Sequence, residues 1–452
     1  MKGIALIVLG GLLQQVQQES TTDAGVHRSA LLLRSRRLPK PEEVRVYDFV
    51  NYHRHEELPE PREPERVSLD ARLLRPTLPT GKAQAFLQVG IRTSRPSRTR
   101  EAGPVNVCLV IDRSGSMAEA KKLDFVKRGL VLFCDALTEG DLLSIVTFDN
   151  GISVLRAAAP VSEGEPLEGL IDGIQPGGGT NLHGGLMAGY AEVRKNLQLP
   201  KSPKVILLSD GQANSGVTDP EKIVGDSGAA NAEGIALSTI GLGLAYNDRL
   251  MSQLAAAGKG TYHFLDSAEG IERTFLHELN GLLAKLGSDP VLRVALAPGV
   301  ALRRVYGYDY AMPAPSTLEF KLLHLPLGLT QIVPLELEVP PGIERLAEAT
   351  LTYTDAASKQ ERAIAVEAKV ERKDGDSPAD PGVHKNLAVA RLSQAFRVAC
   401  VLADRQEPDE ARDRLEDALR TAETLLGPAD QVADKDLARI LGLVRQAREI
   451  LR

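Results

Sequence analysis

The chain has 452 residues, a hydrophobic fraction of 43% and a formal net charge of -6 at pH 7. A single hydrophobic core rarely supports this length, so we expect two or three soluble globular domains. The negative charge argues against a nucleic-acid-binding protein that relies on an overall positive field. The three cysteines, Cys108, Cys134 and Cys400, are too few and too scattered for a disulfide framework or a zinc site.

Residues 1–40 predict a possible signal segment followed by a flexible tether. The apolar run from Gly3 to Leu13 has the length of a signal-peptide core and is too short to span a bilayer. Residues 14–40 are polar, rich in Gln and Arg, and show no periodicity. We therefore expect a secreted or cell-envelope protein, with the cytoplasm as the alternative, and no transmembrane span.

Residues 41–104 predict a short helix and the first part of a β-sandwich. Apolar side chains within residues 46–50 share one helical face. Over residues 83–91 apolar side chains alternate with polar ones, and Gln88 and Arg92 fall on the polar side. This alternation is typical of a strand that is buried on one face only.

Residues 105–287 predict an α/β domain. Short apolar strands alternate here with amphipathic helical patterns, which favours a doubly wound, mostly parallel sheet covered on both faces. Residues 152–155 follow one strand so closely that they favour an antiparallel edge hairpin. The predicted strands are Val107–Ile111, Leu142–Phe148, Val205–Leu208, Ala236–Leu242 and Tyr262–Leu265.

The remainder of the chain predicts more of the sandwich and then a group of helices. Residues 288–372 return to strict alternation with Pro and Gly at the breaks, which is typical of an antiparallel sandwich. Residues 383–452 predict a bundle of three amphipathic helices. We expect strand 83–91 to belong to the sandwich, so that the α/β domain is an insertion within it.

Oxygen-bearing side chains gather at the predicted strand ends of the α/β domain. The first strand runs into Asp112, Ser114 and Ser116, and the third ends at Asp210. A glycine-rich loop between them carries Thr180. Ligands of open parallel sheets bind at the carboxyl ends of the strands, and hard divalent cations prefer oxygen ligands. A helix predicted to begin near Met117 would also direct its positive end toward this edge.

This set of residues resembles the metal-ion-dependent adhesion site of von Willebrand factor type A domains. The family uses an Asp-x-Ser-x-Ser motif, a distant Thr and a distant Asp, which Asp112, Ser114, Ser116, Thr180 and Asp210 match in order. The resemblance covers about residues 105–287. The flanking segments are similar to bacterial cell-envelope proteins in which such a domain interrupts a β-sandwich.

The resemblance implies a non-enzymatic module for protein interaction or adhesion. The five matched residues would hold Mg²⁺, or alternatively Mn²⁺ or Ca²⁺, directly or through water. A carboxylate from an Asp or Glu of a protein partner would fill the open position. Hydroxyl ligands leave residual positive charge on the ion, and an incoming carboxylate neutralises it.

Several polar residues near this motif have other interpretations. Asp141 is typical of a turn, Asp149 is a candidate for a group behind the metal ligands, and His183 is typical of a surface residue at a helix start. Asn214 and Ser209 are candidates for the rim of the site. A further pair of histidines, His53 and His55, is too isolated in the sequence to predict a metal site.

Two other function classes stay open. One is Mg²⁺-dependent phosphoryl transfer at the same strand-end aspartates, but such phosphatases carry a second aspartate where this chain has Ser114. No Gly-x-Ser-x-Gly elbow and no phosphate-binding Gly-x-x-x-x-Gly-Lys loop occurs in the sequence. The other class is a structural envelope protein whose metal site is not used.

Overall fold

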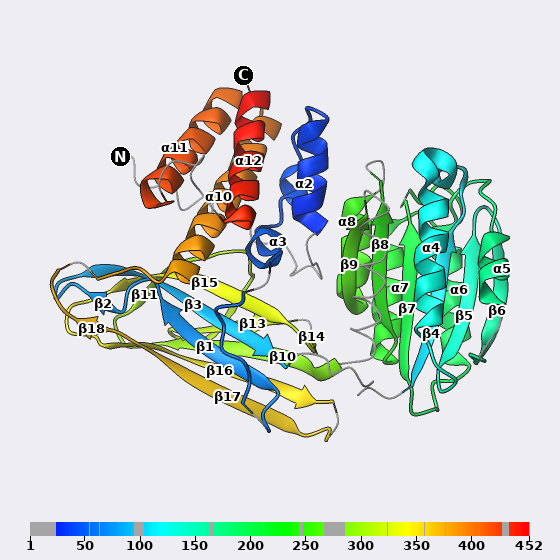
Figure 1. Ribbon diagram of the computed structural model, residues 1–452, viewed down its shortest axis with the longest axis horizontal. Coiled ribbons are helices and arrows are strands. Elements are labelled where there is room, and N and C mark those ends of the chain that lie inside the picture. Colours follow the sequence, from blue (N-terminus) through cyan, green and yellow to red (C-terminus); the bar gives the residue numbers. More distant parts are fainter. Residues whose placement is uncertain are drawn as a thin grey trace.

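The computed structural model describes residues 24–451 except 54, 63, 95–103, 163–165, 211, 244–246, 266–284, 323, 357, 376 and 427–433. It contains a six-stranded α/β domain, an antiparallel sandwich and a group of helices that lies on the sandwich (Figure 1). The α/β domain falls between strands β3 (Ala83–Thr93) and β10 (Lys285–Leu296) of the sandwich. The predicted fold class is confirmed, whereas the predicted signal segment lies outside the described residues.

The α/β domain is built on one mixed sheet with the strand order β6-β5-β4-β7-β8-β9. All neighbouring pairs are parallel except β5 and β6, which form the predicted antiparallel edge hairpin. In sheet order the strands are β6 (Ile152–Pro160), β5 (Leu142–Phe148), β4 (Val105–Asp112), β7 (Ser202–Ser209), β8 (Ala236–Leu242) and β9 (Lys259–Leu265).

Helices cover both faces of this sheet because its central strands are apolar on both sides. On β4, Leu109 packs in one core with α4 and α5, whereas Val110 packs on the opposite face with α6, α7 and α8. Continuous burial of β4, β5 and β7 follows from this double cover. The helices are α4 (Lys122–Asp135), α5 (Leu167–Asp172), α6 (Leu182–Arg194), α7 (Pro220–Ala232) and α8 (Asp248–Ala257).

The sandwich consists of two antiparallel sheets that share one hydrophobic core. The first sheet has the order β1-β3-β15-β11. β3 lies between β1 (Val67–Leu73) and β15 (Thr330–Val339), and β11 (Ala301–Val305) pairs with the other side of β15. The second has the order β12-β13-β10-β16-β17, with β14 (His324–Pro326) also paired to β10. Its other strands are β12 (Ala311–Ala314), β13 (Thr317–Lys321), β16 (Arg345–Asp355) and β17 (Glu361–Lys369), and a small parallel pair joins β18 (Glu371–Arg372) to β2 (Thr77–Leu78).

Strand β3 is not half-buried as its alternation predicted. Its polar side is covered too, so Gln88 is fully buried and Arg92 is 5% exposed. Gln88 Oε1 accepts a hydrogen bond of 2.8 Å from the Asn386 side chain, and Arg92 donates to the Leu58 carbonyl at 2.7 Å. Alternation shows only the chemistry of each face, and here helix α10 and the loop that contains Leu58 supply polar partners for the second face.

Six helical segments form the third part of the molecule, beside the sandwich (Figure 1). The predicted bundle is present as α10 (Pro381–Asp404), α11 (Pro408–Leu426) and α12 (Lys435–Ile450). It shares a core with α2 (Ala24–Arg34), while η1 (Pro41–Glu43) and α3 (Val46–Asn51) connect α2 to the sandwich. The prediction of a tether is therefore wrong for residues 24–34. None of the helices in the described part of the chain has the length and apolarity needed to cross a bilayer.

His53 and His55 come together where α3 meets the helical bundle. Their ring centroids lie 4.6 Å apart. His55 is fully buried, and its Nδ1 lies 3.4 Å from Glu57 Oε1. The pKa of His53 is lowered to about 4, mainly by burial and in addition by the charges of His55 and Lys385, while the charges of Asp436 and Glu57 oppose this shift. The folded protein therefore favours a neutral His53.

We expect this histidine to make the protein less stable in weak acid. The unfolded chain binds a proton at His53 below about pH 6.5, whereas the folded chain resists protonation down to about pH 4. The difference corresponds to about 3 kcal/mol of unfolding free energy, lost as pH falls through that window. Urea denaturation from pH 7 to pH 4 should show a shallower loss for His53→Gln than for the unsubstituted protein. Equal slopes for the two proteins would contradict the assignment.

Candidate metal centre

Three loops of the α/β domain meet at the carboxyl edge of its parallel strands. Asp112 is the last residue of β4, and Asp210 directly follows β7. Thr180 lies two residues before α6. Two backbone hydrogen bonds join the loop after β4 to the loop that carries Thr180. They run from Gly115 N to Gly178 O at 3.0 Å and from Gly177 N to Arg113 O at 2.8 Å. The predicted site residues thus belong to loops that contact one another.

Asp112 is fully buried, and both of its carboxylate oxygens accept hydrogen bonds. Oδ1 accepts from the Ser114 amide at 2.8 Å, and Oδ2 accepts from the Ser209 hydroxyl at 2.6 Å. Burial raises the pKa of the Asp112 carboxyl to about 6; the hydrogen bonds from Ser114 and Ser209 oppose this rise and the Asp210 charge adds to it. An ionised carboxylate has lone pairs left after two such bonds. A bound cation would stabilise its buried negative charge.

Ser114 and Ser116 present their hydroxyl groups side by side. Ser114 is the residue before the 3₁₀-helix η2 (Gly115–Lys121), and Ser116 lies in its first turn. Their Oγ atoms are 3.2 Å apart. Neighbouring ligands of an octahedral Mg²⁺ lie about 3 Å from each other, because each lies about 2.1 Å from the ion. The spacing of these hydroxyls therefore suits two adjacent positions around a small divalent cation.

Thr180 is 3% exposed and is held in place through its backbone. Its amide donates to Asn214 Oδ1 at 2.8 Å, and its carbonyl accepts from the Asn214 amide at 3.1 Å. The preceding residue, Gly179, leaves no room for a side chain, because an added Cβ would lie 2.5 Å from Asn150 Oδ1. Asn214, a candidate rim residue in the sequence, thus fixes the position of the threonine.

The helix after the motif differs from the prediction. An α-helix was expected from near Met117, but residues 115–121 form η2 and the α-helix α4 begins only at Lys122. Lys121 marks the junction with a left-handed backbone, at a φ of 58°. The short 3₁₀ segment allows Ser114 and Ser116 to face the same region, and it places a lysine in the first position of α4.

Lys122 is a residue that sequence reasoning missed. Its ammonium group lies 2.9 Å from Asp210 Oδ2 and donates to the Ser116 carbonyl at 3.1 Å. The Lys122 side chain is only 12% exposed. The sequence prediction placed the start of the helix near Met117, so Lys122 was expected inside the helix. The structure instead places it at the junction of η2 and α4, where its side chain reaches the site.

The other polar candidates have structural roles. Asp149 pairs with Arg113 at 2.9 Å and accepts from the Gly151 amide at 2.8 Å. Asp141 is buried and accepts from the Val105 amide at the opposite end of β4. His183 pairs with Asp226 at 2.8 Å, which joins α6 to α7. Each of these side chains is thus accounted for by contacts that hold the domain together.

The donor set at this edge is poor in carboxylates. In the described ranges, no group of three or more His, Cys, Asp or Glu residues is placed to hold a metal ion. The candidate centre instead combines two carboxylates, Asp112 and Asp210, with hydroxyls from two serines and a threonine. This composition fits a hard cation that retains several water ligands, such as Mg²⁺, better than zinc or copper.

Comparison with known proteins identifies the domain that carries this centre. A family model for the von Willebrand factor type A domain matches residues 105–264. Residues 105–264 are a von Willebrand factor type A (VWA) domain. Domains of this type are generally modules for protein interaction and adhesion, and they commonly bind a divalent cation.

Individual relatives agree with the family match. The chain is 26% identical over 281 residues to the uncharacterized protein YfbK of Escherichia coli, which covers 60% of this chain and 48% of YfbK. It is 30% identical over 165 residues to human inter-alpha-trypsin inhibitor heavy chain H3, covering 35% of this chain and 18% of that protein. The chain thus spans about half the length of YfbK and less of the heavy chain.

A solved structure supports the arrangement beyond the VWA domain. The von Willebrand factor type A protein from Catenulispora acidiphila aligns with 80% of this chain and 88% of its own chain, at a TM-score of 0.54 and 18% identity. This likeness concerns the fold alone. It extends the match from the VWA domain to most of the sandwich and helices.

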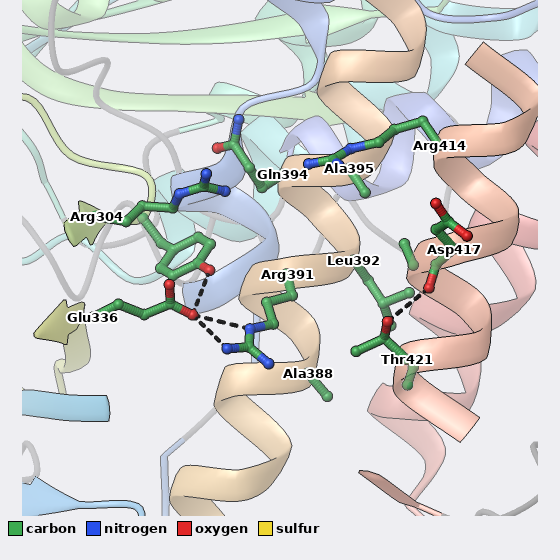
Figure 2. A pocket seen from close by; sticks show the side chains of 13 residues that line it. Arg304, Glu336, Ala388, Arg391, Leu392, Gln394, Ala395, Arg414, Asp417 and Thr421 are labelled. Carbon is green, nitrogen blue, oxygen red and sulfur yellow. Dashed lines mark hydrogen bonds and ion pairs between the residues drawn. The ribbon is translucent and has the colours of Figure 1, made fainter. Parts of the chain in front are cut away.

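A pocket of about 260 Å³ lies outside the VWA domain, between the sandwich and helices α10 and α11 (Figure 2). On one wall, Arg391 of α10 and Glu336 of β15 point toward each other, with Arg391 Nη2 2.7 Å from Glu336 Oε1. Tyr306 donates to the same oxygen at 2.9 Å. These contacts attach the helices to the first sheet of the sandwich, so we assign this wall a structural role.

Proposed function

We propose that the VWA domain binds a divalent cation, in the first place Mg²⁺, through Asp112, Ser114, Ser116, Thr180 and Asp210. Mn²⁺ and Ca²⁺ are alternatives. When bound, the cation would supply a positive charge with an open coordination position for a carboxylate oxygen. The ligand we propose is an Asp or Glu side chain of a protein partner.

One observation carries this proposal. Asp112 is fully buried and bonded to Ser114, whose hydroxyl oxygen lies 3.2 Å from that of Ser116. Backbone hydrogen bonds join this loop to the loop that carries Thr180. A turn or helix cap has no need to bury an aspartate whose ionised form is destabilised there. A cation site does need one, because the carboxylate anchors the ion while the neutral hydroxyls leave it attractive to an incoming anion.

Binding is favoured over phosphoryl transfer by the second position of the motif. Ser114 stands where a phosphatase of this type needs a second aspartate to donate a proton to the leaving group. The Ser114 amide is also committed to Asp112 Oδ1. Hydrolysis of small phosphoesters, lost in Asp112→Asn, would support the enzyme instead. A structural protein with an unused site would bind neither the cation nor a partner through these residues.

The location that we propose is the cell envelope or the extracellular space, with the cytoplasm as the alternative. The support is the apolar run from Gly3 to Leu13, which has the length of a signal-peptide core. Fractionation of the native organism, followed by detection of the protein in each fraction, decides between these compartments.

The proposed function predicts capture that depends on the metal. The protein, immobilised on a resin and exposed to an extract of its native organism, should retain a partner in millimolar Mg²⁺ and release it when the ion is chelated. Blocking the carboxylates of the extract by amidation should prevent capture. Retention that is equal with and without chelator would overturn the adhesion mechanism.

A further inference from the structure

A mostly buried lysine of the chain itself lies against the candidate metal centre. Lys122 contacts Asp210 Oδ2 at 2.9 Å and the Ser116 carbonyl at 3.1 Å, so it touches two of the five proposed ligand residues. Its third neighbour, Glu119, is 3.8 Å away and 73% exposed, which makes this a weak pair. The charge of Lys122 is therefore directed mainly at Asp210.

The position of Lys122 carries a cost of its own. Only 12% of its side chain is exposed, so its charge loses much of its hydration. Lys122 follows η2 and is the first residue of α4, so the dipoles of the two helices act on it in opposite directions and do not compensate this loss. A charged residue at such a position is expected where a site requires it.

The surroundings of Lys122 leave space for its side chain. Gly243, in the loop after β8, has a φ of +76°, and a Cβ added there would lie 3.0 Å from Lys122 Cε. The positive φ of Gly243 itself favours glycine, and a larger residue would in addition meet the end of the lysine side chain. The backbone of the loop after β8 thus passes close to Lys122 and borders one side of its side chain.

We propose that Lys122 tunes the metal centre by exchanging affinity for the cation against affinity for the partner's carboxylate. This inference rests on the proposed function. Asp112 and Asp210 supply two negative charges, and Lys122 offsets one of them. A divalent ion is then held less tightly, but the loaded centre keeps a more positive charge and attracts an anion more strongly.

Replacing this lysine should therefore shift two affinities in opposite directions. In Lys122→Met, Mg²⁺ measured by titration calorimetry should bind about tenfold more tightly. With Mn²⁺ loaded to saturation, acetate should bind several-fold more weakly, measured as the loss of water-proton relaxation when acetate displaces metal-bound water. Lys122→Arg keeps the charge and should restore both affinities to within about threefold of the unsubstituted protein.

Lys127→Met is the matched control. Lys127 lies on the same helix, but its ammonium donates to the Asp172 carbonyl at 2.8 Å, at an exposed contact away from the site. This variant removes the same charge from the protein and should leave both affinities unchanged. If Lys122 has only a structural role, Lys122→Met and Lys122→Arg should have equal affinities, or the affinities for Mg²⁺ and for acetate should both fall in Lys122→Met. Either result would overturn the tuning role.

The outcomes separate this inference from the function on which it rests. If the unsubstituted protein takes up neither Mg²⁺ nor Mn²⁺, the proposed function fails and the tuning role fails with it. If it binds the ions but Lys122→Met binds Mg²⁺ as the Lys127→Met control does, only the tuning role is overturned. If Lys122→Met is too unstable for calorimetry, its thermal unfolding can be measured with and without Mg²⁺. Tighter binding predicts a larger Mg²⁺-induced rise in Tm for Lys122→Met than for the unsubstituted protein.

Discussion

Replacing Asp112 with alanine should lower the affinity of the VWA domain for Mg²⁺ by about a hundredfold or more and abolish Mg²⁺-dependent capture of a partner. The reason is that Asp112 is buried and would supply a charged oxygen ligand in the proposed centre, whereas Ser114, Ser116 and Thr180 would supply neutral ones. Loss of a group that only orients a ligand typically costs ten- to a hundredfold in metal affinity, so loss of the charged ligand should cost at least the upper value, about a hundredfold. Titration calorimetry with Mg²⁺ measures the change directly.

Asp149→Asn provides the matched comparison for this experiment. Asp149 lies in the loop after β5, next to the site, but its carboxylate is engaged by Arg113 and by the Gly151 amide. We expect this variant to retain Mg²⁺ affinity to within about threefold, since an asparagine can still accept the Gly151 hydrogen bond. Equal losses in Asp112→Ala and Asp149→Asn would mean that the ligand set has been assigned wrongly.

The sequence predicted those features of the molecule that depend on residues close together in the chain. Buried parallel strands show as continuous apolar runs, so the position of Asp112 at the end of β4 followed from the pattern alone. Asp210 followed in the same way from the end of β7. The edge at which the strand ends meet is a general property of parallel sheets, which is why residues nearly a hundred positions apart could be assigned to one site.

Features that depend on distant contacts were missed. Helix α2 was predicted as part of a tether because residues 14–40 are rich in Gln and Arg and show no periodicity, yet α2 is buried against helices near the other end of the chain. The burial of Gln88 required Asn386, which is 298 residues away. The role of Lys122 required the junction between a 3₁₀-helix and an α-helix, and that junction changes the start of α4 by only a few residues. Helix boundaries of this kind are the least certain part of any sequence pattern.

The attachment of the VWA domain to the N-terminal helices depends on a buried ionic network. Arg45, the residue before α3, donates to Asp248 of α8 at 2.7 Å and to Asp48 at 3.0 Å. Arg28 of α2 pairs with Glu43 at 2.7 Å and lies 3.7 Å from Asp248. All five side chains are at most 12% exposed. Two arginines thus balance three carboxylates away from water, and Tyr262 donates a further hydrogen bond to Asp248.

Arg45→Met should lower the free energy of unfolding by about 3–5 kcal/mol, because it removes the ion pairs of Arg45 with Asp48 and Asp248 while both carboxylates stay buried. Asp248→Asn should cost less, since its loss leaves two arginines with two carboxylates. Chemical denaturation of both variants measures the ranking. The surface pair of Lys259 and Asp289 is the control, because its atoms also lie 2.7 Å apart while both side chains are more than half exposed. Asp289→Asn should therefore cost no more than about 1 kcal/mol.

The double variant Arg45→Met/Asp248→Asn decides whether the network acts as a unit. In the single Arg45→Met variant, part of the cost comes from the Asp248 charge that remains buried, and the second substitution removes that charge. The combined loss should therefore be smaller than the sum of the two single losses. Strictly additive losses would show that Arg45 and Asp248 stabilise the fold independently, and that the VWA domain is held to α2 and α3 by apolar packing rather than by charge.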